Sequence, residues 1–189
     1  MGVVTKARHA TAFAGAQPNW YNAILMMHEQ PPPRISSAEH AARLRRAEAI
    51  ARSLGFVGRI EYRHAYGGSG GAQYYMAGTI EQDVLALDAE AFRRDAAGDD
   101  FSLTAIIAHE RGHQLILRDK RLRRNIPEGM SGVTEEVLAS LVGALIVPSP
   151  SDAQMLVLKA LGDLVTRGMS LAEASRHVEH VMKYLEAVL

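Results

Sequence analysis

One short stretch of the chain carries the residues best suited to chemistry. Residues 109–113 read His-Glu-Arg-Gly-His, an H-E-x-x-H pattern in a segment that we expect to be helical. Residues four positions apart lie on the same face of a helix, so the imidazoles of His109 and His113 can bind one metal ion. Glu110 is one position further along, about 100° around the helix axis. Its carboxylate would then lie beside the ion, where a bound water molecule sits.

The alternative interpretation is that both histidines lie on a solvated helix face. The neighbouring sequence disfavours it, because residues 103–108 are nearly all apolar and Ile106 and Leu117 fall on the same stripe as the histidines. A polar group buried there without a partner would cost about 1 to 3 kcal/mol, and a metal ion would be that partner. Gly112 costs about 1 kcal/mol relative to alanine in a helix interior, so we expect another element to pack closely against it.

A catalytic zinc ion typically has three protein ligands and keeps a fourth position for water. The residues that could supply the third ligand are Glu128, Glu135, Glu136, His177, His180 and His64. Glu135 and Glu136 open an otherwise strongly apolar segment, where a carboxylate on the buried face needs a partner. Glu136 shares a helix face with Ala139, Ser140 and Gly143, whose small size lets this helix approach the H-E-x-x-H helix closely.

Composition and charge exclude several classes of protein. The chain has 189 residues, and 21 basic residues balance 21 acidic ones, which disfavours a strongly basic nucleic-acid-binding protein. There is no cysteine, so disulfides, thiolate zinc sites and cysteine nucleophiles are excluded. No segment approaches the roughly 20 apolar residues of a membrane helix, and the N-terminus is a poor secretory signal. We therefore expect a cytoplasmic protein without a membrane partner.

The elements that must position these residues follow from periodicity, caps and turn residues. We predict helices over 20–28, 38–54, 103–117, 134–147, 151–167 and 171–188, and strands over 56–66, 73–77 and 83–87. This order predicts an α+β fold, with a small mixed or antiparallel sheet packed on a helical core. We predict an N-terminal arm (1–35), a central domain (36–150) and a C-terminal helical hairpin (151–189) that packs on the same domain.

The H-E-x-x-H segment and its surroundings resemble the gluzincin class of zinc metallopeptidases. In that class the H-E-x-x-H helix is followed by a loop and a second helix with a glutamate ligand, often within E-x-x-x-D. The stretch from Glu136 to Ser140 is similar, with serine where the class usually has aspartate. The resemblance implies that Glu136, rather than Glu135, completes a zinc site with His109 and His113.

Within that class, residues 38–150 are most similar to the compact ImmA/IrrE-type peptidases. These also have an N-terminal helix, a small sheet and a glutamate helix ending in apolar residues and proline, as Leu145 to Pro148 do here. Arg111 stands where many of them have leucine. The resemblance implies that 36–150 is a minimal zincin-like domain that hydrolyses a peptide or protein substrate, with a zinc-activated water and Glu110 as general base. The alternative is a zinc-binding regulatory or interaction protein of this type with little peptidase activity.

The sequence leaves further alternatives for the function and the site. A helical interaction protein with an accidental motif is a third hypothesis. A tetrahedral intermediate also needs a donor or a positive group besides zinc, and the candidates are Tyr66, Tyr74, Tyr75, Arg176, His177 and Tyr184. The basic segment from Arg118 to Arg124 is predicted to be a solvated helix end rather than a nucleic-acid contact. The sequence does not indicate an oligomeric state.

Overall fold

The computed structural model describes residues 35–63, 71–97, 101–123 and 131–189. All of them belong to the unit Pro32–Leu189. The helix predicted over 20–28, and almost all of the predicted arm 1–35, lie outside the described residues. Among the described helices, none is both long and apolar enough to cross a membrane.

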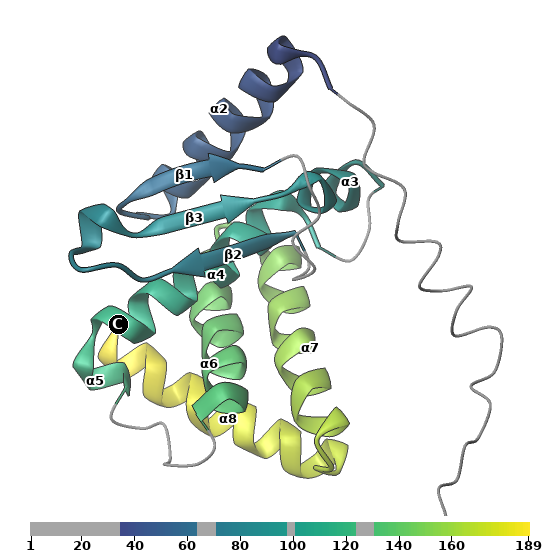
Figure 1. The fold of residues 1–189 in the computed structure, drawn as a ribbon. Helices are drawn as coiled ribbons and strands as arrows, with labels where there is room; N and C mark the ends of the chain where they lie inside the picture. The colour runs from purple at the N-terminus through teal and green to yellow at the C-terminus, as the bar shows by residue number, and fades with distance from the viewer. Residues whose placement is uncertain (1–34, 64–70, 98–100, 124–130) are drawn as a thin grey trace, which may run out of the picture. The chain divides into compact units, whose positions relative to one another are not determined.

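The elements follow one another as a helix, a small sheet and a series of helices, which confirms the α+β class (Figure 1). In chain order they are α2 (Ser37–Ser53), β1 (Arg59–Tyr62), β2 (Ala72–Tyr75), the 3₁₀ helix η1 (Ile80–Gln82), β3 (Val84–Leu87), α3 (Ala89–Ala97), α4 (Leu103–Arg118), α5 (Lys120–Arg123), α6 (Ser131–Ile146), α7 (Pro150–Thr166) and α8 (Leu171–Val188).

The structure differs from the predicted elements at several places. Among the described residues 56–63, the strand expected over 56–66 is only β1, which begins after Gly58 because this glycine adopts a φ of +125°, outside the range of extended strands. Helix α3 was not predicted. Helix α6 begins at Ser131 rather than after a cap at Thr134, so Glu135 and Glu136 lie in its second turn.

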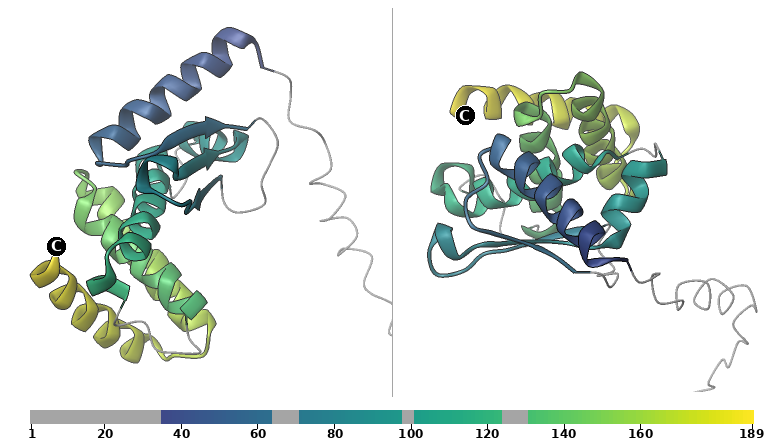
Figure 2. Two further views of the ribbon diagram at one scale, coloured as in Figure 1. Left: turned by 60° about the vertical axis from the view of Figure 1, so that its left-hand side comes forward. Right: turned by 90° about the horizontal axis from the view of Figure 1, so that it is seen from above.

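The sheet has the order β1-β3-β2 and is mixed. β1 pairs with β3 in parallel, with Ile60 opposite Leu85, and β2 pairs with β3 in the antiparallel sense, with Tyr74 opposite the same leucine. The helices lie on one side of this sheet (Figure 2). Side chains on that side are mostly buried, whereas Arg59 and Gln73 on the other side are exposed. The strands therefore show the alternation typical of a sheet with one covered face.

The apolar core consists of two clusters, and the H-E-x-x-H segment lies between them. One cluster joins the sheet to the first half of α4, including Ile107. The other joins the end of α4, including Ile116, to α6, α7 and α8. Helix α6 contributes to both, through Ala144 in the first and Leu141 in the second. The polar residues of the motif are thus held on a helix that is fixed by apolar packing on both sides.

Helices α4 and α6 approach each other through two glycines, one on each helix. A Cβ at Gly112 would lie 2.2 Å from the carbonyl oxygen of Ala139, and a Cβ at Gly143 would lie 2.9 Å from that of Ala108. Both obstacles are backbone atoms, which cannot move aside as a side chain can. The close packing predicted at Gly112 is confirmed. It is this contact that brings the side chains of the two helices together.

The variant Gly112→Ala should therefore destabilise the fold by about 1 to 3 kcal/mol or more, since α4 and α6 must move apart to accept the methyl group. Urea unfolding of the metal-free protein measures this change. Gly162→Ala is a matched control in α7, where an added Cβ meets no atom within 4 Å. Equal stability of the two variants would contradict the close contact.

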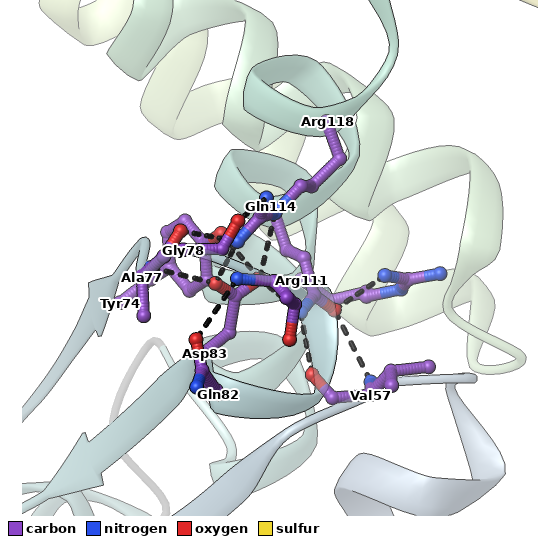
Figure 3. A network of polar contacts seen from close by, with 10 residues as sticks. Val57, Tyr74, Ala77, Gly78, Gln82, Asp83, Arg111, Gln114 and Arg118 are labelled. Carbon is purple, nitrogen blue, oxygen red and sulfur yellow. Dashed lines mark hydrogen bonds and ion pairs between the residues drawn. The ribbon is translucent and has the colours of Figure 1, made fainter.

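Asp83 lies at the centre of a buried polar network that joins the β2–β3 connection to α4 (Figure 3). Its carboxylate accepts hydrogen bonds from the Tyr74 hydroxyl at 2.7 Å, the Ala77 N–H at 2.8 Å and the Gln114 amide at 2.9 Å, and it pairs with the Arg118 guanidinium. The prediction that Arg118 belongs to a solvated helix end was therefore wrong. Burial opposes ionisation of Asp83, but the hydrogen bonds outweigh it and lower its pKa to about 2.

This network predicts a loss of stability in acid. The pKa of Asp83 is about 2 in the folded protein against 3.8 for an ordinary aspartate. The ionised Asp83 therefore adds about 2 kcal/mol to the free energy of unfolding. This contribution is fully present above about pH 4 and is lost as the pH falls toward 2. Urea unfolding between pH 5 and pH 2 should show this slope, and Asp83→Asn should be less stable at pH 7 with a shallower acid slope. The same dependence of stability on pH in the wild type and in Asp83→Asn would contradict the lowered pKa of Asp83.

Candidate metal centre

Helix α4 places the two histidines of the motif one turn apart with their rings in contact. The helix begins after Ser102, whose hydroxyl caps it by accepting a hydrogen bond from the Ala105 N–H. The ring centroids of His109 and His113 are 4.8 Å apart and the rings are nearly perpendicular, at 88°. Their Nε2 atoms are 3.3 Å apart. His109 is only 8% exposed, so the histidines face the core side as expected.

Helix α6 brings Glu136 to the same point. One carboxylate oxygen lies 3.2 Å from Nε2 of His109, and the other lies 3.4 Å from Nε2 of His113. One ligand atom from each of the three residues lies within 4.8 Å of the others, so this group could hold a metal ion. Hydrogen bonding to the two histidines lowers the pKa of Glu136, which keeps its carboxylate ionised.

The other ring nitrogen of each histidine is held by α6. Nδ1 of His109 lies 3.1 Å from the Ser140 hydroxyl, which itself donates to the Glu136 carbonyl and therefore accepts from the ring. Nδ1 of His113 lies 3.0 Å from a carboxylate oxygen of Glu135, which can only accept. Both Nδ1 atoms thus carry a hydrogen also when the rings are neutral. Such partners fix the tautomer and direct the Nε2 atoms toward a metal ion.

Glu135 contacts a histidine of the group without being one of the three converging residues. Its side chain is 28% exposed and lies against His113. The sequence analysis weighed Glu135 only as a metal ligand and did not predict this contact. Burial alone lowers the pKa of His113, but the carboxylates of Glu136, Glu110 and Glu135 together raise it.

The variant Glu135→Ala should weaken metal binding by about 10- to 100-fold, because His113 loses the partner that orients its ring. Competition with a chelator measures the affinity. Glu135→Gln keeps an acceptor oxygen, so its metal affinity should lie between those of Glu135→Ala and the wild type. Glu179→Ala, on the exposed face of α8, is the control and should bind as the wild type does. An unchanged affinity in Glu135→Ala would show that the contact with His113 has no part in metal binding.

Glu110 lies against the edge strand β2. Its side chain is buried, with 7% of the residue exposed, and its carboxylate accepts a hydrogen bond from the Tyr74 N–H. Burial raises the pKa of Glu110, and the nearby histidines only partly oppose this effect. A raised pKa suits a carboxylate that accepts and later donates a proton near neutral pH.

A cavity of about 440 Å³ opens in front of these residues. Its walls come from β2, from α3 and the residues after it, and from α4, α6 and α7. The lining residues are Ala72, Gln73, Tyr74, Arg94, Phe101, Ile106, His109, Glu110, His113, Leu117, Glu135, Glu136 and Lys159. The candidate metal group is therefore accessible from the cavity rather than enclosed by protein.

The remaining candidates lie elsewhere or are already engaged. His64, Tyr66 and Glu128 are outside the described residues, and Arg176, His177, His180 and Tyr184 lie on α8, away from the cavity lining. Tyr75 lies on the uncovered face of the sheet and does not line the cavity. Tyr74 lines the cavity, but its hydroxyl donates to Asp83. None of the described candidates offers a free donor next to the metal group.

The sequence analysis did not single out a charged cavity residue that contacts Glu136. Lys159, on α7, lies 3.5 Å from a carboxylate oxygen of Glu136. It interrupts an otherwise mainly apolar run, and this was the signal that could have identified it.

Comparison with protein-family models, curated proteins and solved structures identifies no match.

Proposed function

We propose that this protein is a zinc-dependent metallopeptidase, in which His109, His113 and Glu136 are the metal ligands and Glu110 is the general base. The observation that carries the proposal is the convergence of His109, His113 and Glu136, together with the hydrogen-bond acceptors that α6 places at the two Nδ1 atoms. With a hydrogen held on each Nδ1, the neutral form of each histidine directs its Nε2 lone pair to the same point as the Glu136 carboxylate. Three electron-pair donors that converge in this way fit a cation.

The type and number of the donors favour zinc in a catalytic site. Two histidines and one carboxylate, with a remaining position open to a cavity, are a common catalytic zinc set, whereas structural zinc sites use four protein ligands. A zinc ion held here would supply a coordinated water with a pKa near about 7 and polarise a carbonyl group. The resemblance of residues 109–113 and 136–140 to the gluzincins supports the same donor set.

The chain's own residues supply the proton transfer and the substrate surface. Glu110 takes a proton from the attacking water and delivers it to the leaving amine, and the Tyr74 N–H holds its carboxylate in place. Within the described sheet β2 is an edge strand, and Ala72, Gln73 and Tyr74 line the cavity. The backbone of an edge strand can pair with an extended peptide. These features favour a peptide or protein substrate.

The proposal is tested by incubating the zinc-loaded protein with a mixture of peptides from a digested proteome and detecting new termini by mass spectrometry. New termini should appear, disappear when the metal is removed by a chelator, and return when zinc is added. A protein that binds one zinc ion per chain and cleaves nothing would contradict the peptidase and favour the regulatory alternative. A protein that binds no metal would contradict both.

A further inference from the structure

A lysine of α7 lies at the cavity side of the metal group. The ammonium of Lys159 is 2.8 Å from a carboxylate oxygen of Asp163 and 3.5 Å from one of Glu136. Its side chain is 28% exposed and lines the cavity. Asp163 is one helical turn further along α7, so this pair holds the ammonium in one direction. α7 in turn packs against α6, which carries Glu136.

Holding a metal ion does not explain this lysine. A divalent cation at His109, His113 and Glu136 would have the positive Lys159 as a near neighbour, and like charges repel. The carboxylates around the cation are already engaged: Glu136 contacts the histidine Nε2 atoms and Glu135 contacts Nδ1 of His113. A positive charge at this place is favourable when a further negative charge arises in the cavity beside the metal ion.

The cavity has few other groups that could meet such a charge. The Tyr74 hydroxyl donates to Asp83, and the guanidinium of Arg94 lies over the ring of Phe101, 5.0 Å from its centroid. Lys159 is therefore the cavity donor that the described contacts place next to the metal ligands.

We propose that Lys159 is a catalytic residue whose ammonium stabilises the negative charge formed on the scissile carbonyl oxygen. This inference rests on the proposed peptidase function. When water oxygen bonds to the carbonyl carbon, the C=O π electrons move onto the carbonyl oxygen and Glu110 receives the water proton. Lys159 donates a hydrogen bond to that oxygen. When the carbonyl re-forms, the C–N bond breaks and the proton on Glu110 passes to the leaving amine.

The first test measures anion binding and needs no turnover. Co²⁺ is bound to the protein in place of zinc, and azide is titrated while the visible absorption of the cobalt is followed. Lys159→Met should weaken azide binding by at least about tenfold, because the attraction between the ammonium and the bound anion is lost. Its affinity for Co²⁺ should be unchanged or higher, since a competing cation is removed from Glu136. Lys159→Arg should recover most of the azide affinity.

The matched control is Lys183→Met. Lys183 pairs with Glu179 at 2.8 Å across one turn of α8, as Lys159 pairs with Asp163, but it does not line the cavity. It should bind azide as the wild type does. A Lys159→Met variant with normal azide affinity and weakened Co²⁺ binding would overturn the proposal, because the lysine would then only position Glu136.

The second test uses a peptide that the wild type cleaves. Lys159→Met should lower kcat by about 10²- to 10³-fold with little change in KM, as expected for a group that acts on the transition state. A change confined to KM would overturn the inference and leave the peptidase standing. Failure of the wild type to bind Co²⁺ would instead refute the proposed function itself, and this inference with it.

Discussion

Replacing His113 by alanine is expected to abolish stoichiometric metal binding, and His109→Ala and Glu136→Ala are expected to do the same. Each change leaves two of the three converging ligand atoms, and the chain has no cysteine that could substitute. Changes in the residues that only orient metal ligands already cost about 10- to 100-fold in affinity, so the loss of a ligand should exceed this. Metal analysis after dialysis against a weak chelator measures the remaining zinc per chain.

His177→Ala is the matched control for the histidine variants. His177 lies on the exposed face of α8 and does not line the cavity, so this variant should keep one zinc ion per chain. Circular dichroism should show that the ligand variants keep their helices, since apolar packing fixes α4 on both sides of the motif. A His113→Ala protein that still carries one tightly bound zinc ion would remove His113 from the site.

The second large effect is expected from Glu110→Gln, which should keep the metal ion and lose hydrolysis by about 10²- to 10⁴-fold. The amide has nearly the same size as the carboxylate, and its oxygen can still accept the hydrogen bond from the Tyr74 N–H. It cannot take a proton from water. The rate of cleavage of one peptide, measured with zinc content and thermal unfolding, separates these effects.

Glu186→Gln provides the comparison for Glu110→Gln, because Glu186 is an exposed carboxylate of α8. It should cleave the peptide at the wild-type rate. Turnover by Glu110→Gln within a few-fold of the wild type would mean that another group accepts the proton. That result would leave the proposed assignment of the metal ligands unchanged.

The parts of the site that depend on helix periodicity could be predicted from the sequence. The spacing of His109 and His113 placed both on one face, and their apolar neighbours indicated that this face is covered. The glycine at 112 indicated a close contact, and the small residues next to Glu136 indicated which helix makes it. These inferences needed only the period of a helix and the cost of an unpartnered polar group.

The parts that depend on how helices cross could not be predicted in this way. Glu135 contacts His113, and Lys159 contacts Glu136. Both contacts depend on the positions and angles at which α6 and α7 pack, and the periodicity of a helix does not encode these. The sequence analysis placed the start of α6 at 134 because threonine is a common residue at the cap position, but the helix begins at Ser131. Arg118 was expected in solvent, but its long side chain reaches Asp83, which lies far away in the sequence.

Diffraction from zinc-containing crystals, with data collected at the zinc absorption edge, tests the central claim most directly. The account predicts one strong anomalous peak about 2.0 to 2.2 Å from Nε2 of His109, Nε2 of His113 and a carboxylate oxygen of Glu136. Glu135 should remain on Nδ1 of His113, outside the coordination sphere. A peak coordinated by Glu135 in place of Glu136, or no peak between these residues, would contradict it.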